Sequence, residues 1–135
     1  MLPHFILAAE SPRALDARTY HLGTPGQPEW RQFEGKTPHG QRLDIRFTAQ
    51  ANAHEATLLL RQDDVKLDWF VELNGSRLGK LFLMEAPLVH ALPVPADALR
   101  DGENTLAISP PSGVDDIFVG DFRLDPRPRS EALSQ

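Results

Sequence analysis

The sequence predicts one all-β domain, a jelly-roll β-sandwich of about nine short strands. Short segments in which apolar and polar residues alternate recur along the chain, separated by turn residues at roughly regular spacing. No segment shows the apolar period of a helix of useful length. The 135 residues suffice for one domain, and 41% hydrophobic with 24% charged residues is typical of a folded protein.

The first half of the chain predicts three strands and one long connection. Residues 5–9 are apolar but too few for a signal peptide, so we expect a first strand there. Residues 11–27 mix Pro, Gly and charged residues without a period, which is typical of a connection. Residues 42–47 alternate cleanly, as a half-buried strand does. Three consecutive leucines within residues 56–61 indicate a more fully buried strand.

The second half begins with a predicted hairpin. Asn74-Gly75 is the pair best suited to a two-residue hairpin turn, so residues 77–83 should return antiparallel to the strand before it. Residues 88–94 alternate again, but Pro93 cannot donate a ladder hydrogen bond, which favours an edge position. The remaining expected elements are strands at residues 105–109 and 117–124, and a Pro-rich polar tail or linker over residues 125–135.

Charge and composition argue against several classes of protein. The formal net charge is −5 and no Lys/Arg cluster is present, so nucleic acid is not an expected partner. No run approaches the roughly 18 apolar residues of a membrane helix, so we expect a soluble protein without a membrane partner. The chain has no cysteine, no His-x-His, no His-Glu-x-x-His and no Gly-x-Ser-x-Gly motif. We therefore expect no enzyme activity and no catalytic residue.

Strand parity places several acidic residues at one end of the sandwich. If the strands run alternately up and down, the loops at residues 35–41, 63–67, 83–87 and 110–116 emerge together. The acidic residues of these loops are Asp63, Asp64, Glu85, Asp115 and Asp116. Clustered carboxylates suit a hydroxyl-rich ligand or a hard cation, so calcium is the one cofactor we consider. The alternative is that each Asp pair only caps its own turn.

The aromatic residues and histidines offer further candidates. Trp69 shares the phase of the apolar residues that follow it, which favours a core position over a sugar-stacking platform. Phe70 then points outward and is the candidate ligand-binding aromatic. Trp30 fits an exposed or a buried position equally well. His90 shares the phase of apolar neighbours, which favours a hydrogen-bonded buried imidazole over a metal ligand.

Two segments resemble the V-x-L-N-G … L-x-x-G-x-N-x-L signature of galactose-binding-like β-sandwiches, which include carbohydrate-binding modules. They read FVELNGSRLG at residues 70–79 and VPADALRDGENTL at residues 94–106. Three further segments are similar to the N-terminal module of bacterial metallohydrolases of the polymerase-and-histidinol-phosphatase superfamily. They read GKTPHG, RQDDVK and KLFLMEA, at residues 35–40, 61–66 and 80–86. The resemblance implies a galactose-binding-like sandwich over residues 1–124 that binds sugar or braces a neighbouring domain.

We therefore expect a non-catalytic carbohydrate-binding or accessory module. Its expected ligand-binding residues are Asp63, Asp64, Phe70, Glu85, Asp115 and Asp116, and no residue is assigned to a metal. The alternative is a structural docking domain of a larger metallohydrolase, with no ligand of its own. A sugar site requires an exposed aromatic beside polar groups, whereas a docking face requires an apolar patch of several hundred Å².

Overall fold

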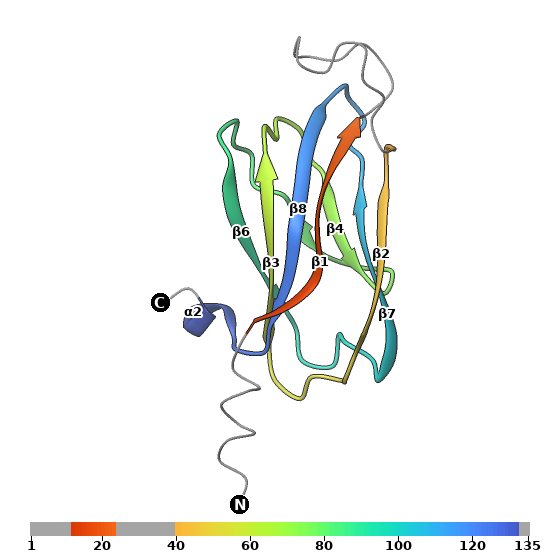
Figure 1. Cartoon of the computed structure of the whole chain (residues 1–135), viewed down its shortest axis with the longest axis vertical. Coiled ribbons are helices and arrows are strands. Elements are labelled where there is room, and N and C mark those ends of the chain that lie inside the picture. The colour runs from red at the N-terminus through yellow and green to blue at the C-terminus, as the bar shows by residue number, and fades with distance from the viewer. Residues whose placement is uncertain (1–11, 24–39, 133–135) are drawn as a thin grey trace, which may run out of the picture.

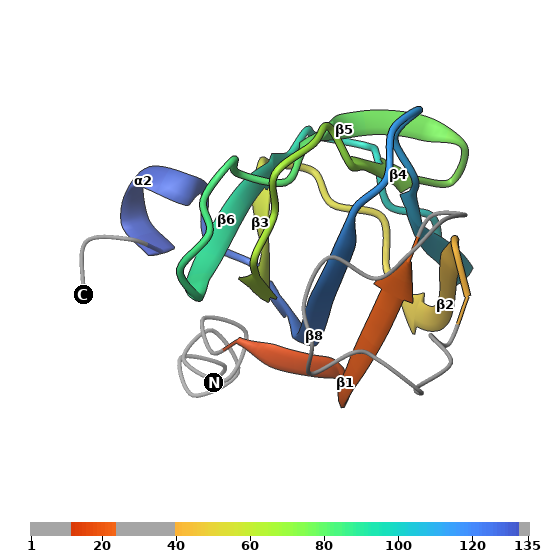
Figure 2. The ribbon, with the colours of Figure 1, turned by 90° about the horizontal axis from the view of Figure 1, so that it is seen from above.

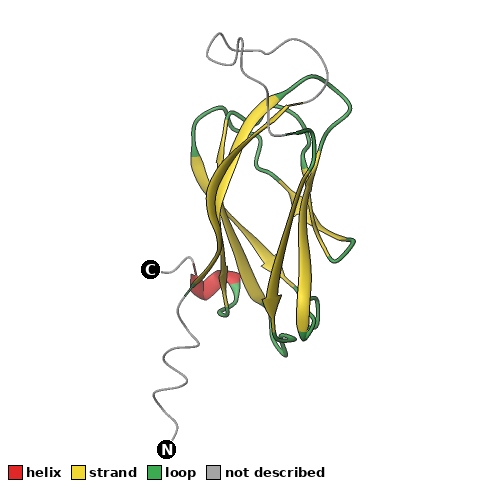
Figure 3. Cartoon of the chain, turned by 45° about the vertical axis from the view of Figure 1, so that its right-hand side comes forward, coloured by secondary structure: helices red, strands yellow, loops and turns green. Residues whose placement is uncertain are grey.

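Two four-stranded antiparallel sheets face each other to form the predicted sandwich (Figures 1 and 3). The structure is a computed structural model and describes residues 12–23 and 40–132. Its elements are β1 (Arg13–Gly23), β2 (Leu43–Ala49), β3 (Ala56–Asp63), β4 (Phe70–Leu73), β5 (Ser76–Lys80), β6 (Leu88–Val94), β7 (Gly102–Ser109), β8 (Asp116–Asp125) and α2 (Arg129–Ala132). The described residues thus hold eight strands, and the strand expected at residues 5–9 lies outside them.

Sheet A has the strand order β1-β8-β3-β6 and sheet B the order β2-β7-β4-β5. Successive strands change sheet at every connection except β4–β5 and, viewed from above, form two layers (Figure 2). Because all neighbouring strands are antiparallel, the connections β3–β4, β5–β6 and β7–β8 emerge together. We call this end the loop end (residues 64–69, 81–87 and 110–115); it lies uppermost in Figure 1.

The core lies between the sheets and follows the predicted alternation. On β2, Leu43 and Ile45 are buried while Asp44 and Arg46 are exposed. Trp69, just before β4, has no exposed surface, which confirms its core position. Burying a Leu, Ile or Phe side chain completely stabilises a fold by about 1.5–3 kcal/mol. Other fully buried side chains are Leu22, Leu60, Leu81, Leu106, Ile108, Ile117 and Phe122.

Two asparagines of the signature motif join the β4–β5 hairpin to β7. Asn74 and Gly75 form the predicted turn, with φ values of 52° and 85° in the left-handed region that such a turn requires. Asn74 Oδ1 accepts the N–H of Thr105 at 3.0 Å, and Asn74 Nδ2 donates to Asn104 Oδ1 at 2.9 Å. The buried Asn104 also accepts the N–H of Arg100 at 2.8 Å. The motif is therefore a hydrogen-bond network that fixes the fold.

The prediction of a connection over residues 11–27 is wrong, because Arg13–Gly23 form the strand β1. This strand runs along β8 at the edge of sheet A, and its register shifts twice between Ala14 and Thr19. Most of its residues before His21 are exposed or half-buried. An edge strand with two bulges shows no two-residue alternation in sequence, which is why its pattern resembled a loop.

Part of the expected C-terminal tail packs against sheet A. After β8, helix α2 contacts β3 and β6. Thr57 Oγ1 donates to the carbonyl of Arg127 at 2.9 Å, and Arg127 Nη2 lies 2.8 Å from Asp125 Oδ2. Burial alone would raise the pKa of Asp125, but the hydrogen bonds from Arg127 outweigh it and the pKa is lowered. Among the described residues, no helix has the length and apolarity needed to span a membrane.

Candidate functional site

The loop end brings three of the predicted carboxylates together. Asp64 follows β3, Glu85 lies between β5 and β6, and Asp115 precedes β8. Burial raises the pKa of Asp64, and the nearby charges of Asp115 and Glu85 raise it further. The parity argument predicted that five acids approach each other, and three of them do. Asp63 and Asp116 lie instead on the outer face of sheet A, and residues 35–39 lie outside the described part of the chain.

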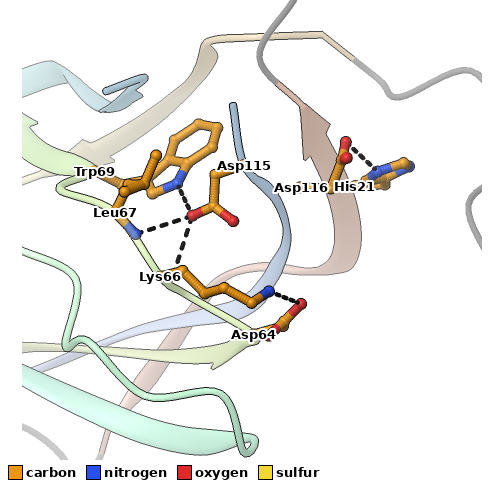
Figure 4. Close-up of polar contacts among 7 residues, drawn as sticks. All are labelled: His21, Asp64, Lys66, Leu67, Trp69, Asp115 and Asp116. Carbon is orange, nitrogen blue, oxygen red and sulfur yellow. Dashed lines mark hydrogen bonds and ion pairs between the residues drawn. The ribbon is translucent and has the colours of Figure 1, made fainter. Parts of the chain in front are cut away.

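Asp115 is buried and binds the protein itself. Its Oδ2 accepts three hydrogen bonds, from the N–H of Lys66 at 3.1 Å, the N–H of Leu67 at 3.1 Å and the indole Nε1–H of Trp69 at 3.0 Å (Figure 4). Hydrogen bonds to the charged form offset the cost of burying a carboxylate. Asp115 thereby orders the β3–β4 connection and holds Trp69 in the core.

Asp64 is equally enclosed. Its side chain is 1% exposed, and Oδ2 lies 2.7 Å from Lys66 Nζ (Figure 4). Its Oδ1 is buried without a hydrogen-bond partner among the described residues. A φ of 58° places it in the left-handed region, which Asp tolerates better than most residues. Of the three converging acids, only Glu85 is therefore open to solvent.

Asp116 belongs to the outer face of sheet A. Its Oδ1 lies 3.3 Å from Nε2 of His21, and both side chains are buried (Figure 4). The His21 ring packs against Phe118 with 5.4 Å between ring centroids. Phe118 pairs in register with His21 on β1 and with Asp63 on β3, so all three side chains leave the sheet on the same side.

A hollow of about 220 Å³ lies on this outer face between β1, β8 and β3. Its lining residues are Thr19, Arg61, Gln62, Asp63, Phe118, Val119 and Gly120. Phe118 and Asp63 are half-buried, and Arg61 is exposed. We call this the sheet A hollow. Its lining brings together a half-buried aromatic side chain, a guanidinium and a carboxylate.

Phe70 lies elsewhere, on the outer face of sheet B. It is half-buried and points outward as predicted, because its neighbour Val71 is completely buried. The guanidinium of Arg77 lies over its ring, 3.6 Å from the centroid. Since Arg77 covers this ring face, a sugar could stack there only by displacing it. The six predicted ligand-binding residues are thus distributed over the loop end and two opposite sheet faces.

The β5–β6 connection carries an apolar patch (Phe82, Leu83 and Met84), whose three residues are between 40% and 52% exposed. Its backbone is held at two points. The buried Gln62 side chain donates to the Phe82 carbonyl at 2.6 Å and accepts the Phe82 N–H at 2.9 Å. Val65 and Met84 exchange two backbone hydrogen bonds of 2.9 Å. The patch is therefore presented on a fixed backbone.

His90 borders this patch. Its Nε2 lies 3.0 Å from the carbonyl of Lys80, and its ring centroid is 6.2 Å from that of Phe82. The side chain is half-buried, and burial lowers its pKa. The imidazole is hydrogen-bonded as predicted but only half-buried, because His90 lies on the edge strand β6 beside the exposed Phe82. Among the described residues, no three His, Asp or Glu side chains are placed to hold one metal ion.

Phe118 was missed at the level of sequence although a signal for it existed. It lies between Ile117 and Val119, which are both buried, so the phase argument applied to Phe70 assigns it to the outer face as well. Phe82 carried no such signal. Its exposure depends on how Gln62 holds the loop backbone.

A larger hollow, of about 800 Å³, opens at the opposite end of the sandwich. Alanines 49, 51, 53 and 56 line much of it. Two of its polar side chains bind the protein itself: Arg13 donates to the Thr48 carbonyl, and Asn52 donates to the carbonyls of His54 and Pro95. The sheet A hollow differs in having a phenylalanine, Phe118, beside Arg61 and Asp63 on its lining.

Replacing Asp115 tests its structural role. Asp115→Ala leaves three donors without their acceptor and should lower the free energy of unfolding by about 3–5 kcal/mol. Asp115→Asn keeps an acceptor oxygen and should cost less. Urea denaturation measures both, with the exposed Asp44→Ala as a control expected to change by about 0.5 kcal/mol or less. Losses below about 1 kcal/mol in both Asp115 variants would contradict this role.

Asp64→Asn should stabilise the protein at neutral pH. Burial raises the native pKa of Asp64, so its charged form lowers stability at pH values above that native pKa. As the pH falls from there toward the ordinary value of 3.8, the native carboxyl takes up a proton and the difference from the variant should shrink. Lys66 is 28% exposed and can turn to solvent. Urea unfolding at several pH values, with the half-exposed Asp68→Asn as control, measures this; a difference that widens in acid contradicts it.

Comparison with known proteins identifies no family, since no family model and no curated protein sequence match the chain. Solved structures with some similarity include a GH26-CBM35 β-(1,4)-mannanase of Podospora anserina, with 19% identity and a TM-score of 0.47. The match covers 89% of this chain and 29% of the mannanase chain, so this chain spans less than a third of its length.

Two further structures are single modules. A family 35 carbohydrate-binding module from Clostridium thermocellum is 15% identical over 81% of this chain and 97% of its own, with a TM-score of 0.43. The CBM36-1 domain of a multidomain xylanase from the hindgut metagenome of Trinervitermes trinervoides is 11% identical over 76% and 97%, with a TM-score of 0.38. None of the three is described as a metallohydrolase, so that narrower resemblance stays a prediction. The chain is similar to these carbohydrate-binding modules only as a β-sandwich.

Proposed function

We propose that this chain is a non-catalytic carbohydrate-binding module whose ligand occupies the sheet A hollow. The observation that carries the proposal is the position of Phe118, half-buried on the lining of a hollow that Arg61 and Asp63 also line. A pyranose has an apolar C–H face and a polar rim of hydroxyls. An aromatic ring beside charged hydrogen-bonding groups complements both.

The polar groups of the hollow have distinct capacities. The guanidinium of Arg61 offers only donors, in a planar fork that can engage two oxygens together. The carboxylate of Asp63 offers only acceptors, and Thr19 offers a hydroxyl that does either. Sugar hydroxyls donate and accept, so each of these groups can be satisfied by one ligand.

The aromatic floor of the hollow is supported before any ligand arrives. His21 packs beside the Phe118 ring, and Asp116 holds the His21 imidazole. These residues lie on paired strands instead of free loops, so little side-chain freedom remains to be lost on binding. Asp116, predicted as a ligand-binding residue, would then act by positioning His21.

The proposal assigns no cofactor and no catalysis to the chain. Asp64 and Asp115 support the protein's own backbone and side chains. The candidate hollow has one carboxylate on its lining, whereas metal-free glycosidases use two on opposite sides of the sugar. The binding assay tests whether sugar binding requires calcium, because a chelator abolishes only calcium-dependent binding.

A thermal-shift assay with glycosides and oligosaccharides of glucose, galactose, mannose and xylose tests the proposal. A ligand at about 100 times its Kd should stabilise the native chain by about 2.7 kcal/mol and raise Tm in a saturable way. Phe118→Ala should abolish the shift, while Phe70→Ala on the opposite face should retain it. EDTA should leave the shift unchanged, and its loss with EDTA would indicate calcium. A panel without any saturable shift would refute carbohydrate binding by these sugars.

The apolar patch favours a second function, docking onto a neighbouring domain. Three large apolar side chains on a fixed backbone are the kind of exposed surface that marks protein contacts. Docking would use the loop end at the β5–β6 connection, leaving the outer face of sheet B free. The module would then serve as an accessory domain, with or without a sugar of its own.

Leu83→Asp tests this docking function. A protein captured by the immobilised wild-type chain should be identified, purified and titrated against both forms, and should bind the variant at least tenfold more weakly. Val114→Asp, an equally apolar-to-acidic change on the β7–β8 connection, should bind as the wild type does. Equal binding by all three chains would remove the patch from the docking surface.

A further inference from the structure

Of the four edge strands in the described part of the chain, β2 is the one with neither a register shift nor a proline. Proteins commonly use bulges, prolines and covering elements to keep edge strands from pairing with other chains. The registers of β1 and β5 shift along their partners, and β6 contains Pro93 and is contacted by α2. β2 pairs with β7 without a shift, and its other side is the edge of sheet B (Figure 1).

The backbone of β2 presents free hydrogen-bonding groups at this edge. On β7, the N–H of Thr105 donates to Asn74 Oδ1 at 3.0 Å and its carbonyl accepts the N–H of Asn74 at 2.8 Å, so both groups point away from β2. Arg46 pairs with Thr105 and therefore points its own N–H and carbonyl to the open side, as does Asp44 two residues earlier. Within the described part of the chain, no residue bonds these groups.

The side chains of β2 complement a second copy of the same strand. In an antiparallel pair centred on Ile45, Asp44 of each copy lies opposite Arg46 of the other. Both residues have their backbone groups on the open side, so each of these pairs can exchange two hydrogen bonds. On the inner face, Leu43 lies opposite Phe47 of the second copy, and Ile45 lies opposite its counterpart. Backbone, charged and apolar groups thus match in one register.

The charges on the outer face are available for this pairing. Arg46 is exposed and makes no ion pair with any described residue. Asp44 Oδ1 lies 3.3 Å from Nε of Arg42, with the two side chains 54% and 47% exposed, so Asp44 Oδ2 is left for a second cation. A register centred on Arg46 would set two arginines directly opposite each other, which destabilises a strand pair. The charge pattern therefore favours the register centred on Ile45.

We propose that two copies of this chain join edge to edge through β2, so that their B sheets form one continuous sheet. Residues that lie opposite each other share one face of a sheet, so sheet A of both copies lies on the same side of the joined sheet. The outer faces of the two A sheets then point in the same direction. For a module that binds through sheet A, the pair engages a repetitive ligand at two points and gains apparent affinity.

Sedimentation of the full chain over a range of concentrations tests this pairing, with the mass expected to rise from 15.0 kDa toward twice that value. Arg46→Asp sets acids opposite each other at two places and should raise the dimer Kd about tenfold or more. The double variant Asp44→Arg/Arg46→Asp exchanges the charges and should restore the Kd. Arg77→Asp makes the same charge change on β5, the opposite edge of sheet B, and should leave the Kd unchanged.

Amide hydrogen exchange locates the contact without any substitution. The N–H groups of Asp44 and Arg46 should exchange more slowly as the protein concentration rises, whereas those of the edge strand β6 should not change. A chain that is monomeric at about 1 mM overturns the proposal. A dimer with unchanged exchange at Asp44 and Arg46, or a double variant as weak as Arg46→Asp, overturns it as well. These outcomes are independent of sugar binding, which the thermal-shift assay measures separately.

Discussion

The carboxylate of Asp115 gathers three donors from a connection that has no regular structure of its own. A buried charge without partners would cost several kcal/mol, so the β3–β4 connection must bring its N–H groups and the Trp69 indole to this one oxygen. That requirement fixes the largest core side chain and the path of the chain between the two sheets. Asp64 and Asp115 are thereby part of the scaffold at the loop end, and the surfaces that remain for recognition include the sheet faces and the apolar patch.

The use of the loop-end acids by the scaffold explains why they are separate from the candidate hollow. Asp64 and Asp115 turn inward toward Lys66 and Trp69, whereas Asp63 is one residue earlier on β3 and faces outward. A one-residue step along a strand reverses the side-chain direction. Two adjacent aspartates therefore take different roles, one in the scaffold and one on a surface suited to polar ligands.

Sequence patterns predicted most of the fold, because alternation, the Asn74 turn and the motif at Asn104 are local signals that the structure uses directly. β1 escaped prediction because bulges at an edge interrupt alternation. The convergence of acids followed from strand parity, but their burial could not, since the donors that satisfy Asp115 come from residues 46–49 positions away and from backbone groups. The phase argument could have placed Phe118 on the outer face of its sheet, whereas no sequence signal indicated that the apolar patch would be exposed.

The way Gln62 and Val65 hold the β5–β6 connection has an evolutionary consequence. Within the described part of the chain, the hydrogen bonds by which Phe82 and Met84 hold this loop are made by their backbones. Residues 82–84 can accordingly be exchanged without changing how the loop is anchored. Selection can rewrite this surface, exchanging one partner for another, while the sandwich beneath it keeps the same sequence.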